Sequence, residues 1–142
     1  MVDHLAKYLI VTVFFLAGCN AGINDSNLSY ISVKDAQIML RDGQSNLLGV
    51  EKKTLLIDSR KKVDFNKNHI DGSINIPFGH LFAYEYKLNN VETIIVCGKS
   101  DNDPVAIAMS KELIKQGFKD VKTLRGGVDG WQDDYGSIES GD

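Results

Sequence analysis

An excess of positive charge and a long hydrophobic run are both absent from this sequence. Lys and Arg number 16 against 19 Asp and Glu, so the formal net charge is −3 and the pI is about 5.6. An acidic chain has no electrostatic basis for binding nucleic acid or an anionic membrane surface, and we expect neither partner. The sequence also has no internal repeat and no low-complexity tract. The absence of repeats and low-complexity tracts favours one globular domain of roughly 100 residues.

The longest apolar run, residues 8–16, is too short for a bilayer, which needs about 20 apolar residues. With Lys7 before it, the run has the shape of a secretory signal. The sequence Leu16-Ala17-Gly18-Cys19 that ends it resembles the lipobox of bacterial lipoproteins. This resemblance implies that residues 1–18 are a signal peptide and that Cys19 is lipidated. An ordinary signal peptide and an uncleaved N-terminal helix are the alternatives.

The predicted location is therefore outside the cytoplasm, with the lipid as the attachment to the membrane. Asn20 after the lipidated cysteine resembles outer-membrane sorting in Gram-negative bacteria, which implies the periplasmic face of that membrane. In a Gram-positive source the same anchor would hold the domain on the outer face of the single membrane. Residues 19–29 are expected to be a polar tether, residues 30–131 the domain, and residues 132–142 an acidic, flexible tail.

Within the domain, short β-rich runs alternate with helical patterns. We expect strands at 54–57, 73–76, 93–97 and 121–124, and helices at 33–42, 63–68, 78–88 and from Pro104 onward. Ser32 and Asp103 are predicted N-caps, and Gly43 and Gly117 fit the positions that follow helix ends. Such alternation predicts an α/β domain with a parallel sheet covered on both faces.

Cys97 ends one of the predicted strands and opens a polar loop. In open parallel sheets the ligand crevice lies beyond the carboxyl ends of the strands, and a thiol there can act as a nucleophile. The alternative is a small buried hydrophobe, because free cysteine is among the most buried residue types.

Five sequence segments, in this order, resemble the signature of the rhodanese-like domains. They are LLIDSR at 55–60, DF at 64–65, HIDGSINIP at 69–77, IIVC at 94–97 and GFKDVKTLRGGVDGW at 117–131. The resemblance covers nearly all of residues 30–131. It implies a single α/β domain with a mostly parallel sheet of about five strands and helices on both faces.

The resemblance further implies a sulfurtransferase in which Cys97 takes sulfane sulfur from a donor such as thiosulfate. The resulting persulfide would pass its sulfur to a thiol, including a protein thiol, or to cyanide. Backbone N–H groups of the loop could cradle the sulfur anion. The expected substrate-binding loop is Gly98, Lys99, Ser100, Asp101 and Asn102. Asp58 and Arg60 could orient this loop, although a structural hydrogen-bonded pair is the simpler interpretation.

The sequence departs from the family in this loop. Active members usually have an arginine five residues after the cysteine and then Ser or Thr, whereas this chain has Asn102 and Asp103. The aspartates raise the local negative potential, which disfavours a thiolate and an anionic donor. With Asp103 occupied as a helix cap, we expect Asp101 to be the more damaging charge. These differences argue against thiosulfate as the natural donor.

Other chemistries lack the residues they require. Related phosphatases and arsenate reductases bind oxyanions with an arginine, and none occurs between Cys97 and Arg125. A P-loop would need glycine where Thr93 stands. His69 is a lone histidine, so we expect no metal site and no cofactor. Three functions stay open: a sulfurtransferase or sulfur carrier, a catalytically inactive module that binds a partner through the altered loop, and a redox protein that forms a mixed disulfide at Cys97. A low thiol pKa would separate the first and third from the second.

Overall fold

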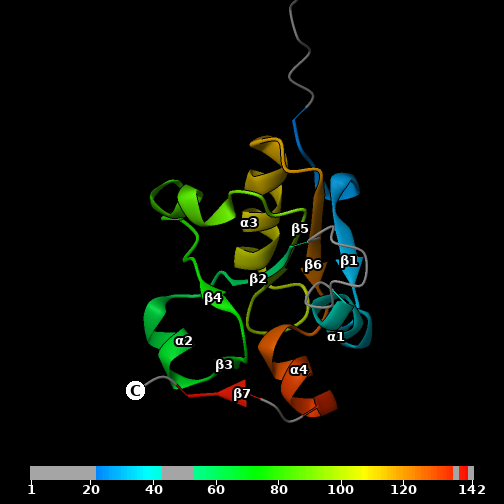
Figure 1. The fold of residues 1–142 in the computed structure, drawn as a ribbon, viewed down its shortest axis with the longest axis vertical. Helices are drawn as coiled ribbons and strands as arrows, with labels where there is room; N and C mark the ends of the chain where they lie inside the picture. Colours follow the sequence, from blue (N-terminus) through cyan, green and yellow to red (C-terminus); the bar gives the residue numbers. More distant parts are fainter. Residues whose placement is uncertain (1–21, 43–52, 136–137, 141–142) are drawn as a thin grey trace, which may run out of the picture.

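The computed structural model describes residues 22–42, 53–135 and 138–140 (Figure 1). In chain order its elements are η1 (Asp25–Asn27), β1 (Ser29–Ile31), α1 (Val33–Asp42), β2 (Thr54–Asp58), α2 (Lys62–Lys67), β3 (His69–Ile70), β4 (Ile74–Asn75), η2 (Leu81–Leu88), β5 (Thr93–Cys97), α3 (Pro104–Lys115), β6 (Asp120–Leu124), α4 (Gly127–Tyr135) and β7 (Ile138–Glu139), where η denotes a 3-10 helix. No helix within these ranges is long and apolar enough to cross a membrane.

The main sheet has five strands in the order β1-β6-β5-β2-β4, and every pairing in it is parallel. This confirms the predicted α/β domain with a mostly parallel sheet of about five strands. The strand that ends at Cys97, β5, lies in the centre between β6 and β2. All five carboxyl ends therefore lie at one edge of the sheet, with Asp58 of β2 directly beside Cys97 in the ladder.

Helices cover both faces of the sheet, as expected (Figure 1). Alternate residues of β5 enter two separate hydrophobic clusters, because successive side chains of a strand point to opposite faces. Ile95 and Cys97 belong to the cluster beneath α1 and α4. Ile94 and Val96 belong to the cluster beneath α3 and η2.

The best-marked helices begin where the sequence predicts. At α1, the Ser32 hydroxyl accepts the Asp35 N–H at 3.1 Å and donates to the Asp35 carboxylate at 2.7 Å. At α3, Asp103 is the N-cap and Pro104 the first helical residue. Gly117 follows the end of α3 with φ +99°, a conformation that glycine adopts at no steric cost. The other expected helix-end glycine, Gly43, lies outside the described residues.

Several elements differ from the sequence prediction. The expected helix at 78–88 is the 3-10 helix η2, and it begins only at Leu81. Before it, the His80 N–H donates to the Pro77 carbonyl at 2.9 Å, and Gly79 has φ +92°, so a turn occupies the first residues of the predicted helix. The expected strand at 73–76 is shortened to β4.

The expected tail and tether also contain ordered structure. Helix α4 continues to Tyr135, and β7 pairs antiparallel with β3. The helix buries Trp131 to 6% exposure, and β7 satisfies backbone groups of β3 that would otherwise form an open edge. At the other end of the chain, the Lys111 ammonium lies 2.6 Å from the carboxylate of Asp25 in η1. The described secondary structure thus begins at Asp25 and ends at Glu139.

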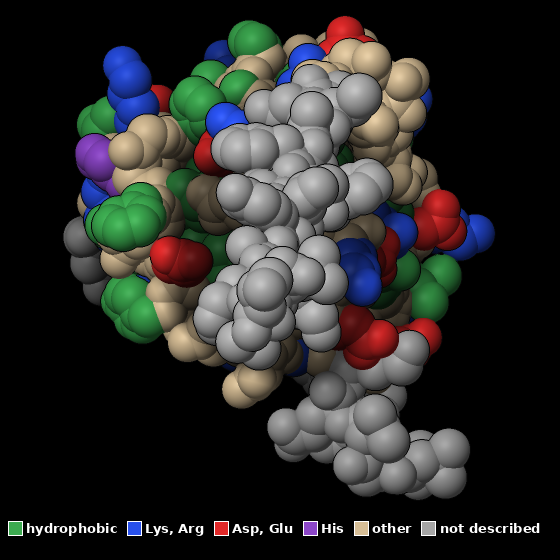
Figure 2. Space-filling model, turned by 90° about the horizontal axis from the view of Figure 1, so that it is seen from above, with side chains coloured by type: hydrophobic (Ala, Val, Ile, Leu, Met, Phe, Trp, Pro, Cys, Tyr) green, Lys and Arg blue, Asp and Glu red, His purple; other side chains and the backbone are tan. Residues whose placement is uncertain are grey.

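The chain enters the domain at the end opposite the carboxyl ends of the strands (Figure 1). Figure 2 looks onto this end, where charged side chains of both signs and hydrophobic side chains are visible around the grey residues. Two aromatic side chains of η2, Phe82 and Tyr86, are 86% and 66% exposed.

Candidate functional site around Cys97

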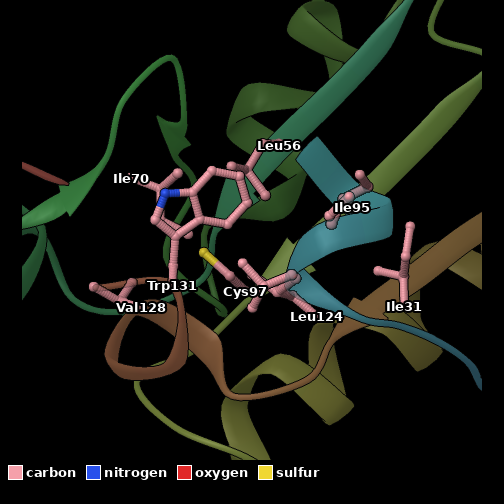
Figure 3. Close-up of a cluster of buried hydrophobic side chains, with 10 residues drawn as sticks. Ile31, Leu56, Ile70, Ile95, Cys97, Leu124, Val128 and Trp131 are labelled. Carbon is pink, nitrogen blue, oxygen red and sulfur yellow. The ribbon is translucent and has the colours of Figure 1, made fainter. Parts of the chain in front are cut away.

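The side chain of Cys97 is fully buried. It belongs to the cluster beneath α1 and α4, and in Figure 3 its sulfur points toward Trp131. Seen from the sulfur, Leu56 and Ile70 lie behind the indole ring. Val128 lies beside Trp131. The thiol thus has the position of a small buried hydrophobe, which was the alternative to a nucleophile.

Burial raises the pKa of the Cys97 thiol well above its ordinary value, because an apolar surrounding disfavours a thiolate. The Asp58 carboxylate raises this pKa further, and so does Asp103. The Arg60 guanidinium and the backbone N–H of Cys97 lower it. The net direction keeps Cys97 a neutral thiol at pH 7. Asp101, which we expected to be the more damaging charge, is not among the causes, and Asp103 is.

Asp103 holds the start of the loop against the start of α3. One carboxylate oxygen accepts the N–H groups of Val105 at 2.8 Å and Ala106 at 3.3 Å. The other accepts the N–H of Lys99 at 2.8 Å. The predicted N-cap is therefore present, and one of the N–H groups expected to cradle sulfur is bound to a carboxylate instead. The side chains of Lys99, Ser100, Asp101 and Asn102 are exposed.

The loop also lies against the turn between β6 and α4. The carbonyls of Gly98 and Lys99 accept the N–H groups of Val128 and Asp129 at 3.0 and 2.9 Å. The Asp101 carboxylate accepts the Gly126 N–H at 3.2 Å. Gly127 makes this contact possible, because a Cβ there would lie 2.7 Å from the Gly98 carbonyl oxygen. In the sequence, the Gly126-Gly127 pair is only part of the resemblance to a family signature, and its packing role becomes visible in the structure.

Asp58 and Arg60 form a buried ion pair with several hydrogen bonds. Arg60 Nη2 lies 2.6 Å from Asp58 Oδ2, and Arg60 Nε donates to both carboxylate oxygens. Arg60 Nη2 also donates to the Asn68 carbonyl at 2.7 Å. Burial lowers the pKa of Arg60, but the hydrogen bond and charge of Asp58 raise it above its ordinary value. The pair is structural in its contacts, and its guanidinium also favours the thiolate form of Cys97.

Ser59 is a site residue that the sequence reasoning missed. Its side chain is buried, and its N–H and hydroxyl both donate to the Cys97 carbonyl, at 3.0 and 2.9 Å. Its position between Asp58 and Arg60 at a strand end was the available signal. Asn75 completes this support by donating to the carbonyls of Asp58 and Arg60 at 3.1 and 2.9 Å.

A pocket of about 750 Å³ opens beside the loop. Its lining residues are Ser59, Arg60, Lys61, Asp64, Lys67, Asn68, Pro77, Phe78, Lys99, Asp103, Val105 and Asp129. Cys97 is not among them, so the pocket reaches the loop but not the thiol. Of the predicted loop, only Lys99 lines it.

His69 makes contacts with two neighbouring parts of the chain. Its Nδ1 lies 3.0 Å from the Phe65 carbonyl oxygen and its Nε2 lies 3.6 Å from the Glu139 carboxylate. Within the described ranges no three His, Cys, Asp or Glu side chains form a group that could hold a metal ion.

Comparison with known sequences gives the same family along most of the chain. The model of the rhodanese-like domain matches residues 41–134. The uncharacterized protein YibN of Escherichia coli K12 is 33% identical over 98 residues, and the match covers 63% of this chain and 63% of that protein. The adenylyltransferase and sulfurtransferase UBA4 of Candida albicans is 31% identical over 96 residues, covering 61% of this chain and 21% of that protein. The chain spans between 10% and 63% of the length of the curated relatives it matches.

Solved structures agree with the fold. The rhodanese-like domain of the Anabaena protein Alr3790 has a TM-score of 0.61 at 23% identity, with 78% of each chain covered. At this identity the likeness concerns the fold alone. Since the family model matches more than half of the sequence and the described sheet has the same fold, the chain belongs to the family of rhodanese-like domains.

Proposed function

We propose that the protein is a sulfur carrier or sulfurtransferase in which Cys97 holds sulfane sulfur as a persulfide. The observation that carries this proposal is the place of Cys97 at the carboxyl end of the central strand β5, where the resemblance puts the family's sulfur-carrying cysteine. Burial raises the pKa of the resting Cys97 thiol and the Arg60 guanidinium lowers it only in part, so transfer requires the sulfur to be exposed first. One distant relative, UBA4, is named a sulfurtransferase.

The transfer occurs in two balanced steps. The Cys97 thiol loses its proton to solvent, and the thiolate attacks the outer sulfur of a donor persulfide. The new bond joins Cys97 Sγ to that sulfur, the donor S–S bond breaks, and the donor leaves as a thiolate. An acceptor thiolate then attacks the terminal sulfur, and Cys97 leaves as a thiolate. The sequence of steps needs no external oxidant or reductant.

Both steps require the loop to move, because Cys97 is fully buried and does not line the neighbouring pocket. The donor we favour is a persulfide on a protein or a small thiol rather than free thiosulfate. Asp58 and Asp103 both disfavour negative charge at Cys97. In addition, the sequence has no arginine between Cys97 and Arg125 that could bind an oxyanion.

We also propose that the domain is exported and held on the membrane by a lipid on Cys19. The support is the apolar run at 8–16 followed by Leu16-Ala17-Gly18-Cys19. Membrane attachment in this proposal comes from the lipid, and Asn20 favours the periplasmic face of the outer membrane in a Gram-negative source.

The test is the mass of the Cys97-containing peptide after the protein is incubated with glutathione persulfide or with thiosulfate. We expect one added sulfur from the persulfide, its removal by cyanide, and no addition in Cys97→Ser. No addition from either donor would contradict sulfur transfer. A larger adduct containing the donor thiol would instead indicate a mixed disulfide and the redox function.

A catalytically inactive binding module is the second candidate, favoured by the burial of the Cys97 thiol and by its raised pKa. Asp103 accepts the Lys99 N–H and Asp101 accepts the Gly126 N–H of the turn before α4, so these loop groups are bonded within the domain. The thiol lies in the hydrophobic core. In this case Cys97→Ala would leave partner binding unchanged, and neither donor would load the wild-type protein.

A further inference from the structure

We propose that Asp103 is the specificity-determining residue of this site and that its carboxylate excludes oxyanion sulfur donors such as thiosulfate by occupying the backbone N–H groups at the loop mouth. This inference rests on the proposed sulfur transfer at Cys97. It assigns to one residue the preference for a persulfide donor over an oxyanion donor.

The contacts of Asp103 are those of a bound anion. Its two oxygens accept three backbone N–H groups, two from the first turn of α3 and one from Lys99. N–H groups at a helix N-terminus form a ready anion site, and here a side chain of the same chain fills it. An incoming anion would have to displace this carboxylate before it could use the same donors.

Gly98 gives the carboxylate room. A Cβ on Gly98 would lie 2.4 Å from Asp103 Cγ and 2.8 Å from its Oδ2, so no other residue fits without moving Asp103. The glycine that follows Cys97 and the aspartate that begins α3 are therefore one packing unit. This contact explains how the Asp103 carboxylate can lie against the Lys99 N–H.

Asp103 also contacts the pocket and acts on the charge of the thiol. It lines the pocket of about 750 Å³, which Cys97 does not. It is also one of the two carboxylates that disfavour negative charge on the Cys97 sulfur. Asp101 belongs to the same loop, but it does not line the pocket and is not among the groups that shift the pKa of Cys97. Its carboxylate accepts the Gly126 N–H instead.

Charge selectivity at Cys97 measures this role directly. The rates of alkylation of Cys97 by uncharged iodoacetamide and by anionic iodoacetate are followed in the full chain by peptide mass spectrometry, which separates Cys97 from Cys19. Both reagents are small and need the same loop opening, so the ratio of their rates cancels the opening step. We expect Asp103→Asn to lower the iodoacetamide-to-iodoacetate ratio about fivefold or more, because one negative charge near the sulfur is removed.

Matched variants separate this role from a structural one. Asn retains the N-cap acceptor, and Asp103→Ser is a second capping variant, so both should fold. Asp101→Asn removes the same charge from the same loop and should leave the ratio within about twofold of wild type, since Asp101 is not among the groups that act on the Cys97 thiol. The capping variants should also gain sulfur loading from thiosulfate.

Three results would overturn the inference. An unchanged ratio in both capping variants, with persulfide loading intact, would contradict only the role of Asp103. Equal falls in Asp103→Asn and Asp101→Asn would indicate general loop charge rather than a specific residue. Absence of labelling by either reagent, together with absence of persulfide loading, would contradict sulfur transfer as well.

Discussion

The state of Cys97 is decided by its immediate neighbours. The side chains of Leu56, Ile70 and Trp131 exclude water from the sulfur, and two carboxylates disfavour the thiolate. Arg60 acts in the opposite sense, but its guanidinium is already bonded to Asp58. A neutral resting thiol follows, and exposure of Cys97 would both hydrate the sulfur and restore its ordinary acidity.

Stability should therefore depend on alkaline pH through this residue. In the unfolded chain Cys97 ionises near its ordinary pKa of 9.0, whereas in the folded protein its raised pKa keeps it protonated. The stabilisation is fully present below the unfolded pKa and is lost as pH rises above it toward the folded pKa, by about 1.4 kcal/mol per pH unit. Urea unfolding at pH 7.5 and pH 10 should show a larger fall for wild type than for Cys97→Ala. Equal falls in the two proteins would contradict the raised pKa.

At the level of elements, the loop after β5 and the turn before α4 behave as one unit. Backbone hydrogen bonds join Gly98 to Val128 and Lys99 to Asp129, and Gly127 permits the close approach. Helix α4 also supplies Trp131, which covers the sulfur (Figure 3). Movement of this turn is thus the direct route to an accessible thiol.

Gly127→Ala should push the loop after β5 away from the turn before α4. Its Cβ would meet three backbone atoms at 2.7 Å, and φ is already +57°, so we expect a loss of about 2 kcal/mol in the free energy of unfolding and faster alkylation of Cys97. Gly117→Ala is the matched control, since its φ is +99° but no atom lies within 4 Å of its Cβ. It should cost about 1 kcal/mol without changing the alkylation rate. Equal alkylation rates in both variants would argue against this route.

Elements with strong local signals were predicted well, and those that depend on distant partners were not. Asp103 before Pro104 marks the start of α3, and Ser32 with Asp35 marks the start of α1, because capping is a local hydrogen-bond pattern. Strand β7 has no comparable signal, since it exists by pairing with β3 nearly seventy residues earlier. The position of Cys97 at a strand end was also predicted from local sequence, because an apolar run ends there. Its burial beneath Trp131 depends instead on how α4 packs.

Considered as a whole molecule, the domain has its chain entry and its candidate site at opposite ends. The described part of the chain begins at one end, and the carboxyl ends of the strands lie at the other (Figure 1). If the lipid is on Cys19, the stretch from the lipidated residue to Gly22 consists of residues 19–21. Three residues span at most about 11 Å. The candidate site would then face away from the membrane, toward partners that approach from solution.

Replacing Cys19 tests the anchor. In a bacterial host, the wild-type chain should occur in the membrane fraction with the mass of a lipidated chain that begins at Cys19. Cys19→Ser should lose the lipid mass and move to the soluble fraction, while Cys97→Ser should stay in the membrane fraction. Retention of an unlipidated Cys19→Ser chain in the membrane fraction would indicate an uncleaved N-terminal helix instead.

The parallel pairing of β1 with β6 has a consequence for the order of folding. Ser29 pairs with Lys122, so the first strand of the sheet finds its neighbour only after almost the whole domain has been synthesised. Contacts between such distant residues form slowly, because the intervening chain must first be ordered. The sheet cannot be completed on a growing chain that is still short of β6. If the chain is exported as proposed, translocation during synthesis would begin before this sheet could be completed, because β6 is the last of its five strands to be made.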